Sequence, residues 1–141
     1  MGRVLGLDLG TKTIGIACSD LLKIVASGVE TYRFAENDLE DALNHVLQVA
    51  KERDVEKFVL GLPKHMNGDI GERAQICLDF KDKLEASSGK QVIMIDERWT
   101  TKQAERGLLQ ADMSRKKRKA KVDALAANII LQTYLDKEKG R

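Results

Sequence analysis

Residues 4–19 constrain the fold most, because they combine two apolar strands, a tight turn and a charge in an apolar setting. They read Val-Leu-Gly-Leu-Asp-Leu-Gly-Thr-Lys-Thr-Ile-Gly-Ile-Ala-Cys-Ser, which predicts a β-hairpin. Asp8 lies inside the first strand, between Leu7 and Leu9. A carboxylate among apolar residues is costly unless its charge is compensated. A metal ion, a hydrogen-bonding turn or a basic partner would each compensate it.

The rest of the chain alternates between strand-like and helix-like patterns. We expect strands at residues 3–9, 14–19, 24–34, 57–62 and 91–96. Helices are expected from residue 37 or 38 to 53, 71 to 87, 100 or 101 to 110, and 119 or 121 to 136. Three leading strands followed by alternating elements predict an α/β fold, a single domain over residues 1–141 with one mixed sheet and helices on both faces.

Composition excludes several classes of protein. The net charge of +2 does not by itself indicate nucleic-acid binding. Cys18 and Cys77 have no metal-type spacing, and His45 and His65 lie far apart, so we expect no zinc site. Neither a signal peptide nor an apolar run of transmembrane length is present, which predicts a soluble cytoplasmic protein without a membrane partner.

Carboxylates occur on three separate elements: Asp8 in the first strand, Asp96-Glu97 at the end of the last strand, and Asp123 near the start of the last helix. In α/β sheets, strand ends and helix ends meet at the sites that bind ligands. Oxygen ligands suit Mg²⁺ or Mn²⁺, and paired ions of this kind catalyse phosphodiester displacement. Converging carboxylates without histidine or cysteine therefore favour phosphoryl chemistry over zinc hydrolysis.

Each of these carboxylates also has a structural explanation. Asp8 could hydrogen-bond the backbone of the following turn. Glu97 could form a surface ion pair with Arg98, and Asp123 in the first turn of a helix is favoured by the helix dipole alone. The small residues Ala124, Ala126 and Ala127 shift the balance for Asp123, because they would let the helix approach the sheet closely.

A basic segment holds six cations in seven residues: Arg115, Lys116, Lys117, Arg118, Lys119 and Lys121. Such runs are usually solvated loops. Cations just before a helix also oppose the helix dipole and repel one another, and phosphates would neutralise both effects. With Lys12 and Arg98, the segment predicts a surface that binds the nucleic-acid backbone rather than reading bases.

The motifs together resemble the YqgF family, small bacterial proteins described as Holliday junction resolvases and as pre-16S ribosomal RNA processing nucleases. The resemblance rests on residues 7–10, 15–17, 61–63, 96–100, 122–127, 130–131 and 134–135, in the family's order. It implies a ribonuclease H-like fold with a five-stranded mixed sheet and two-metal nuclease chemistry. It also implies that Asp8, Glu97 and Asp123 form the catalytic, metal-binding triad.

The leading hypothesis is therefore a nuclease dependent on Mg²⁺ or Mn²⁺ that cleaves structured RNA or branched DNA, with ribosomal particles as a further partner. A non-catalytic RNA- or ribosome-binding factor is the first alternative. An actin-like ATP-binding domain is the second, because residues 8–15 also resemble a phosphate-binding hairpin. Junction cleavage would need a homodimer, whereas RNA cleavage needs only a monomer.

Overall fold

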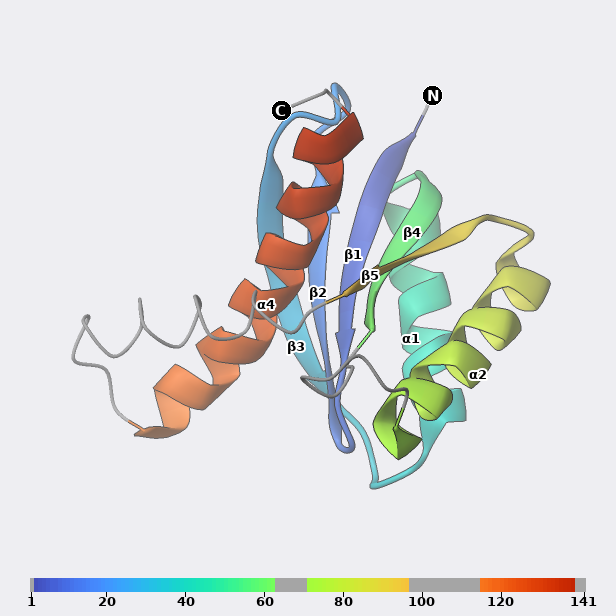
Figure 1. Cartoon of the computed structure of the whole chain (residues 1–141), viewed down its shortest axis with the longest axis vertical. Helices are drawn as coiled ribbons and strands as arrows, with labels where there is room; N and C mark the ends of the chain where they lie inside the picture. The colour runs from blue at the N-terminus through green and yellow to red at the C-terminus, as the bar shows by residue number, and fades with distance from the viewer. Residues whose placement is uncertain (1, 63–70, 97–114, 139–141) are drawn as a thin grey trace.

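The computed structural model describes residues 2–62, 71–96 and 115–138, with the side chains of all these except residues 72, 96 and 115–125. Five strands and three helices follow one another in these ranges (Figure 1). In chain order they are β1 (Arg3–Leu9), β2 (Thr13–Ser19), β3 (Ala26–Arg33), α1 (Leu39–Glu52), β4 (Val55–Leu62), α2 (Glu72–Ser88), β5 (Val92–Asp96) and α4 (Arg115–Glu138). The helix predicted to begin at residue 100 or 101 lies outside the described residues.

The strands form one mixed sheet in the order β3-β2-β1-β4-β5. β1, β2 and β3 are antiparallel neighbours, whereas β1, β4 and β5 are parallel. The predicted hairpin, the third antiparallel strand and the apolar parallel strand at residues 57–62 are confirmed. Because β1 lies at the centre, it is hydrogen-bonded along both edges and its position is rigidly fixed.

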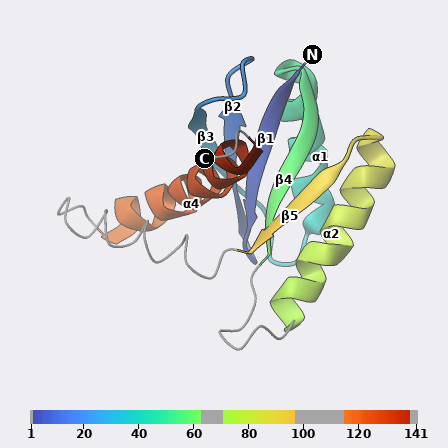
Figure 2. The same cartoon turned by 45° about the horizontal axis from the view of Figure 1, so that its top comes forward.

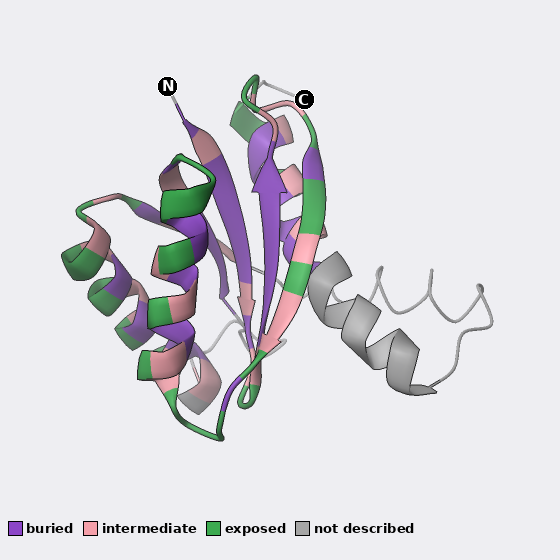
Figure 3. Ribbon diagram, turned by 180° about the vertical axis from the view of Figure 1, so that it is seen from behind, coloured by how far each residue is buried: buried purple, intermediate pink, exposed green. Residues whose placement is uncertain are grey.

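Helices cover both faces of the sheet, as the sequence predicts. α1 and α2 pack on one face and α4 crosses the other (Figures 2 and 3). Two separate buried clusters result. The larger one contains Leu5, Leu7 and Leu9 of β1 together with side chains of α1 and α2. The smaller one joins Val4 to the buried face of α4.

The ends of the helices follow their capping residues. Asp38 precedes α1, and its side chain accepts a hydrogen bond from the Asp41 backbone N–H at 3.3 Å. Gly89 ends α2 with a left-handed backbone (φ 70°), which glycine adopts without steric cost.

Within the described ranges, no helix is long and apolar enough to cross a membrane.

The start of α4 corrects one prediction. The sequence pattern places the beginning of the last helix at residue 119 or 121, after the basic segment, whereas α4 begins at Arg115. The apolar pattern that marks a packed helix begins only at Val122, after the basic segment. Arginine and lysine are good helix formers, so the backbone stays helical through the basic segment without an apolar face.

Candidate active site

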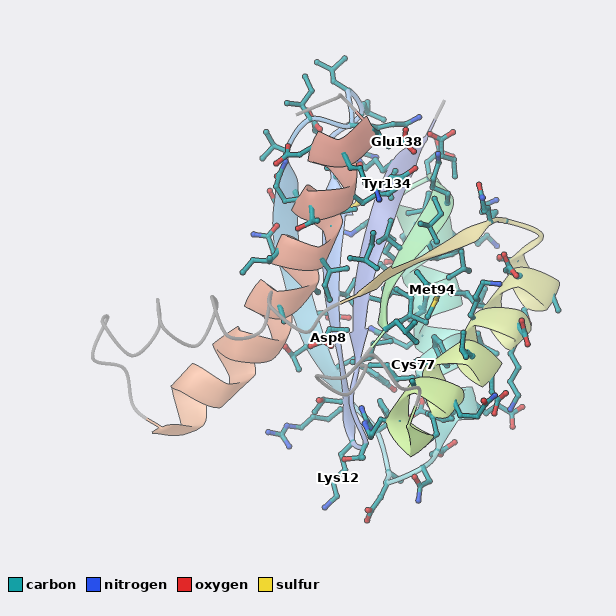
Figure 4. The ribbon with its side chains drawn as sticks, viewed as in Figure 1. Asp8, Lys12, Cys77, Met94, Tyr134 and Glu138 are labelled. Carbon is teal, nitrogen blue, oxygen red and sulfur yellow. The ribbon has the colours of Figure 1, made fainter. Side chains whose placement is uncertain are left out.

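Asp8 lies at the C-terminal end of β1, on the face covered by α4 (Figure 4). It pairs with Gly15 of β2 and is half-buried. Leu7 and Leu9 on either side are buried in the α1–α2 cluster. Because side chains alternate along a strand, the Asp8 carboxylate lies on the opposite face from these two leucines. The structure thus gives the charge a half-buried position at the end of the sheet where β1 terminates. This end, where the parallel strands β1, β4 and β5 all terminate, is called the C-terminal edge of the sheet.

The backbone of α4 passes very close to β1 near Asp8. A Cβ atom on Gly6 would lie 2.6 Å from Leu131 Cβ and 3.0 Å from the Ala127 carbonyl oxygen. α4 runs opposite to β1, because Val4 at the start of β1 lines the same cavity as Leu135 near the end of α4 (Figure 1). Residues nearer the C-terminal end of β1 therefore lie opposite residues nearer the N-terminal end of α4.

Asp123 belongs to α4, one helical turn before Ala127. Its backbone position is described, but its side chain is not. Glu97 and Arg98 lie outside the described residues. Asp96, which immediately precedes Glu97, ends β5 and pairs with Leu62 at the end of β4. Since β1, β4 and β5 are parallel, their C-terminal ends lie along one edge of the sheet.

Backbone hydrogen bonds within the turn of the first hairpin, and from the neighbouring Phe34 backbone, hold that turn in place. The Gly10 N–H donates to the Thr13 carbonyl at 2.7 Å, and the Phe34 N–H donates to the Lys12 carbonyl at 2.9 Å. The Lys12 side chain is exposed at the tip of the turn, just beyond the end of β1 (Figure 4). The structure therefore holds this predicted cation at the same edge as Asp8.

The basic segment forms the first two turns of α4. This part of the helix extends beyond the sheet on the side of β3 (Figures 1 and 2). The side chains from residue 115 to residue 121 are not described. Among the described side chains, no three His, Cys, Asp or Glu residues form a group suited to a metal ion. The predicted triad stays a prediction, since two of its three side chains are not described.

Arg73 is a residue of this edge that the sequence reasoning missed. Its Nη2 donates to the Leu9 carbonyl oxygen at 2.7 Å, which ties the first turn of α2 to the end of β1. The sequence does show that Arg73 falls in the first turn of a helix, where the helix dipole disfavours positive charge and a nearby anionic or carbonyl partner is therefore expected. That signal alone does not say which group the cation contacts.

Comparison with known proteins identifies the family. The sequence profile of the RuvX family, described as Holliday junction resolvase, matches residues 2–137. The chain belongs to the RuvX (YqgF) family. A Listeria monocytogenes protein named as a candidate pre-16S rRNA nuclease is 50% identical over 134 residues, which cover 95% of this chain and 97% of the relative. A Bacillus cereus protein with the same name is 46% identical over 136 residues, covering 96% and 99%.

Solved structures confirm the resolvase-like fold of this RuvX family member. Thermus thermophilus RuvC in complex with a Holliday junction substrate superposes with a TM-score of 0.59 at 17% identity, covering 99% of this chain and 97% of RuvC. The fowlpox virus Holliday junction resolvase gives a TM-score of 0.62 at 12% identity, covering 96% and 99%. These likenesses establish the ribonuclease H-like architecture of the sheet and its helices.

Proposed function

We propose that this RuvX family member is a nuclease that hydrolyses phosphodiester bonds in structured nucleic acid, with precursor 16S ribosomal RNA as its substrate. The observation that carries the substrate is the 46–50% identity, over nearly the whole chain, to proteins named for that activity. The family match argues against the actin-like ATP-binding alternative. On this proposal the protein works in the cytoplasm on precursor ribosomal particles.

The proposed catalytic residues are Asp8, Glu97 and Asp123. The approach of β1 and α4 supports the pairing of Asp8 with Asp123. Gly6 lies against the turn of α4 that contains Ala127, so the next inward-facing residue of β1 lies toward the preceding turn of the helix. That strand residue is Asp8 and that turn contains Asp123. Because β1 and β5 are parallel, Glu97, which follows β5 directly, would lie near the same end of the sheet as Asp8.

The donor set fits a hard divalent cation. Asp8 offers carboxylate oxygens in a half-buried position, and no described histidine or cysteine lies on this edge. Asp8, Glu97 and Asp123 would together hold two Mg²⁺ or Mn²⁺ ions. Ions in this position supply positive charge that stabilises the attacking and leaving oxygens of a phosphodiester. The role of the protein is to fix the carboxylates on a central strand, a strand end and a packed helix.

The cations around this edge would hold the substrate backbone. Lys12 at the hairpin tip and Arg98 beyond β5 are proposed to contact phosphates beside the cleaved bond. The basic segment of α4 (Arg115, Lys116, Lys117, Arg118, Lys119 and Lys121) concentrates positive charge along nearly two helical turns beyond the sheet. Such charge binds the phosphate backbone in a sequence-independent and salt-dependent way.

Replacing Asp8 by asparagine tests the proposed chemistry. We expect Asp8→Asn to abolish cleavage of precursor 16S rRNA in Mg²⁺, to weaken Mn²⁺ binding in calorimetry, and to leave the fold and RNA binding largely intact. Asp20→Asn is the matched control, because Asp20 lies in the β2–β3 turn at the opposite end of the sheet. Full cleavage by Asp8→Asn would overturn the catalytic assignment.

The family description favours a second candidate substrate, the four-way DNA junction. A cleavage panel of junction DNA against precursor 16S rRNA, run with wild type and Asp8→Asn, separates the two. Symmetric junction cleavage would also require two active sites, so light scattering should then show a homodimer, whereas a monomer suffices for RNA. Binding of either substrate without cleavage in Mg²⁺ or Mn²⁺ would instead favour a non-catalytic binding factor.

A further inference from the structure

Arg73 holds a guanidinium against the end of the central strand, one residue beyond Asp8. Its Nη2 donates to the Leu9 carbonyl oxygen at 2.7 Å, and its side chain is half-buried. A guanidinium carries five N–H donors, and this bond uses one of them. The bond fixes where the cation lies, so further donors can serve a ligand at the edge of the sheet.

The described side chains give Arg73 no ion-pair partner. No carboxylate among the described side chains lies within ion-pairing distance of it. It also occupies the first turn of α2, where the helix dipole disfavours a cation. A half-buried cation in this position is more favourable when an anion binds beside it, and guanidinium groups bind phosphate oxygens in a bidentate manner.

The alternation of β1 places this cation relative to the proposed catalytic carboxylate. Asp8 lies on the α4 face of the strand, whereas Leu9 and α2 lie on the other face. Arg73 and Asp8 therefore flank the same strand end from opposite sides. A nucleic-acid strand that crosses this edge with one phosphate at Asp8 would carry a neighbouring phosphate toward Arg73.

We propose that Arg73 binds a backbone phosphate next to the scissile one, as a substrate contact separate from the carboxylate triad and from the basic segment. The proposal rests on the proposed function as a nuclease. It assigns Arg73 two tasks, which are to anchor α2 to the end of β1 through Leu9 and to position the substrate strand across that end.

Salt-dependent binding tests the proposal without any cleavage. A fluorescent four-way DNA junction is titrated with the protein in EDTA, and the logarithm of the binding constant is plotted against the logarithm of the salt concentration. The slope of this plot is negative. Loss of one phosphate contact should make it less steep by about 0.9 and weaken binding about fivefold at roughly 0.15 M salt. We expect this from Arg73→Gln, while Arg73→Lys, which keeps the charge, should retain the slope.

Arg3→Gln is the matched control. Arg3 also donates to a backbone carbonyl, that of Arg53 at 2.9 Å, but at the opposite end of β1. It should bind the junction like wild type. Unchanged binding by Arg73→Gln would overturn the proposal, and so would equal weakening by the Gln and Lys variants with no change of slope, because that indicates a structural role. If Arg73→Gln fails to fold, loss of the wild-type slope in Arg73→Lys overturns it.

The two proposals fail in different ways. If wild type neither binds the junction or precursor rRNA nor cleaves them in Mg²⁺, the proposed function itself is wrong. If wild type binds and cleaves while the Arg73 variants keep the wild-type salt slope, only the phosphate contact is wrong.

Discussion

The close approach of α4 to β1 predicts a strong effect of adding one methyl group at Gly6. In Gly6→Ala the new Cβ would lie 2.6 Å from Leu131 Cβ, about 1 Å closer than the roughly 3.5–4.0 Å at which carbon atoms pack. β1 is bonded on both edges and cannot retreat, so α4 must move away. Overpacking of this kind costs about 3 kcal/mol, and the higher strand propensity of alanine returns about 0.7 kcal/mol. The net loss of unfolding free energy is about 2 kcal/mol.

Urea unfolding measures that loss, and single-turnover cleavage measures its consequence. A domain of this size has a stability of about 5–15 kcal/mol, so the variant should still fold. A shift of α4 by about 1 Å would misplace Asp123 relative to Asp8 and lower the cleavage rate about 100-fold, with nucleic-acid binding largely unchanged.

Gly89→Ala is the control for the glycine substitution itself. Gly89 has φ 70°, and apart from its chain neighbours and the backbone of α2, no described atom lies within 4 Å of the place that a Cβ would take. Alanine there costs about 1–2 kcal/mol of backbone strain without touching α4. Its cleavage rate should stay at the wild-type level. An unchanged unfolding midpoint and full cleavage in Gly6→Ala would refute the close-packing argument.

Further predictions concern the β2–β3 turn and the α4 core. The Asp20 carboxylate accepts hydrogen bonds from the Ile24 and Val25 N–H groups, which lower its pKa below the ordinary value of 3.8. Its stabilisation is present above that value and lost as pH falls through the folded-state pKa, so wild type should lose more stability below about pH 4 than Asp20→Asn in urea titrations. Leu131→Ala, at a fully buried position, should cost about 2–5 kcal/mol. Leu22→Ser should change unfolding by less than about 0.5 kcal/mol, because Leu22 is 71% exposed.

Local patterns predict most of the fold correctly. The glycine-flanked hairpin, the helix after Asp38 and the apolar run at residues 57–62 each depend on interactions between near neighbours, which the sequence displays directly. The length of α4 does not follow from such patterns. Its first turns, from Arg115 to Lys121, have no apolar stripe in the sequence, so no periodic pattern marks them as helix.

The candidate site is harder to predict, because it depends on contacts between distant elements. Asp8 is recognisable as a charge in an apolar strand, and the structure places it half-buried at the sheet edge. Arg73 carries no comparable signal, since its role depends on a backbone carbonyl 64 positions away. No propensity or periodicity links two such residues. The packing of α2 on β4 and β5 brings Arg73 to the end of β1.

The two faces of β1 and β2 bear on the proposed role of Asp8, a short side chain on the face covered by α4. On β1, the residues that face α1 and α2 are Leu5, Leu7 and Leu9, and on β2 they include Ile14 and Ile16. The residues of these two strands that face α4 include a smaller set, Val4, Gly6 and Ala17. Small side chains let the helix backbone approach the sheet, so carboxylates with one methylene group can meet between them. The proposed site therefore requires the alternation of large and small residues along β1 and β2, as packing does. Enlarging a member of the small set next to Asp8 should impair cleavage before it unfolds the protein.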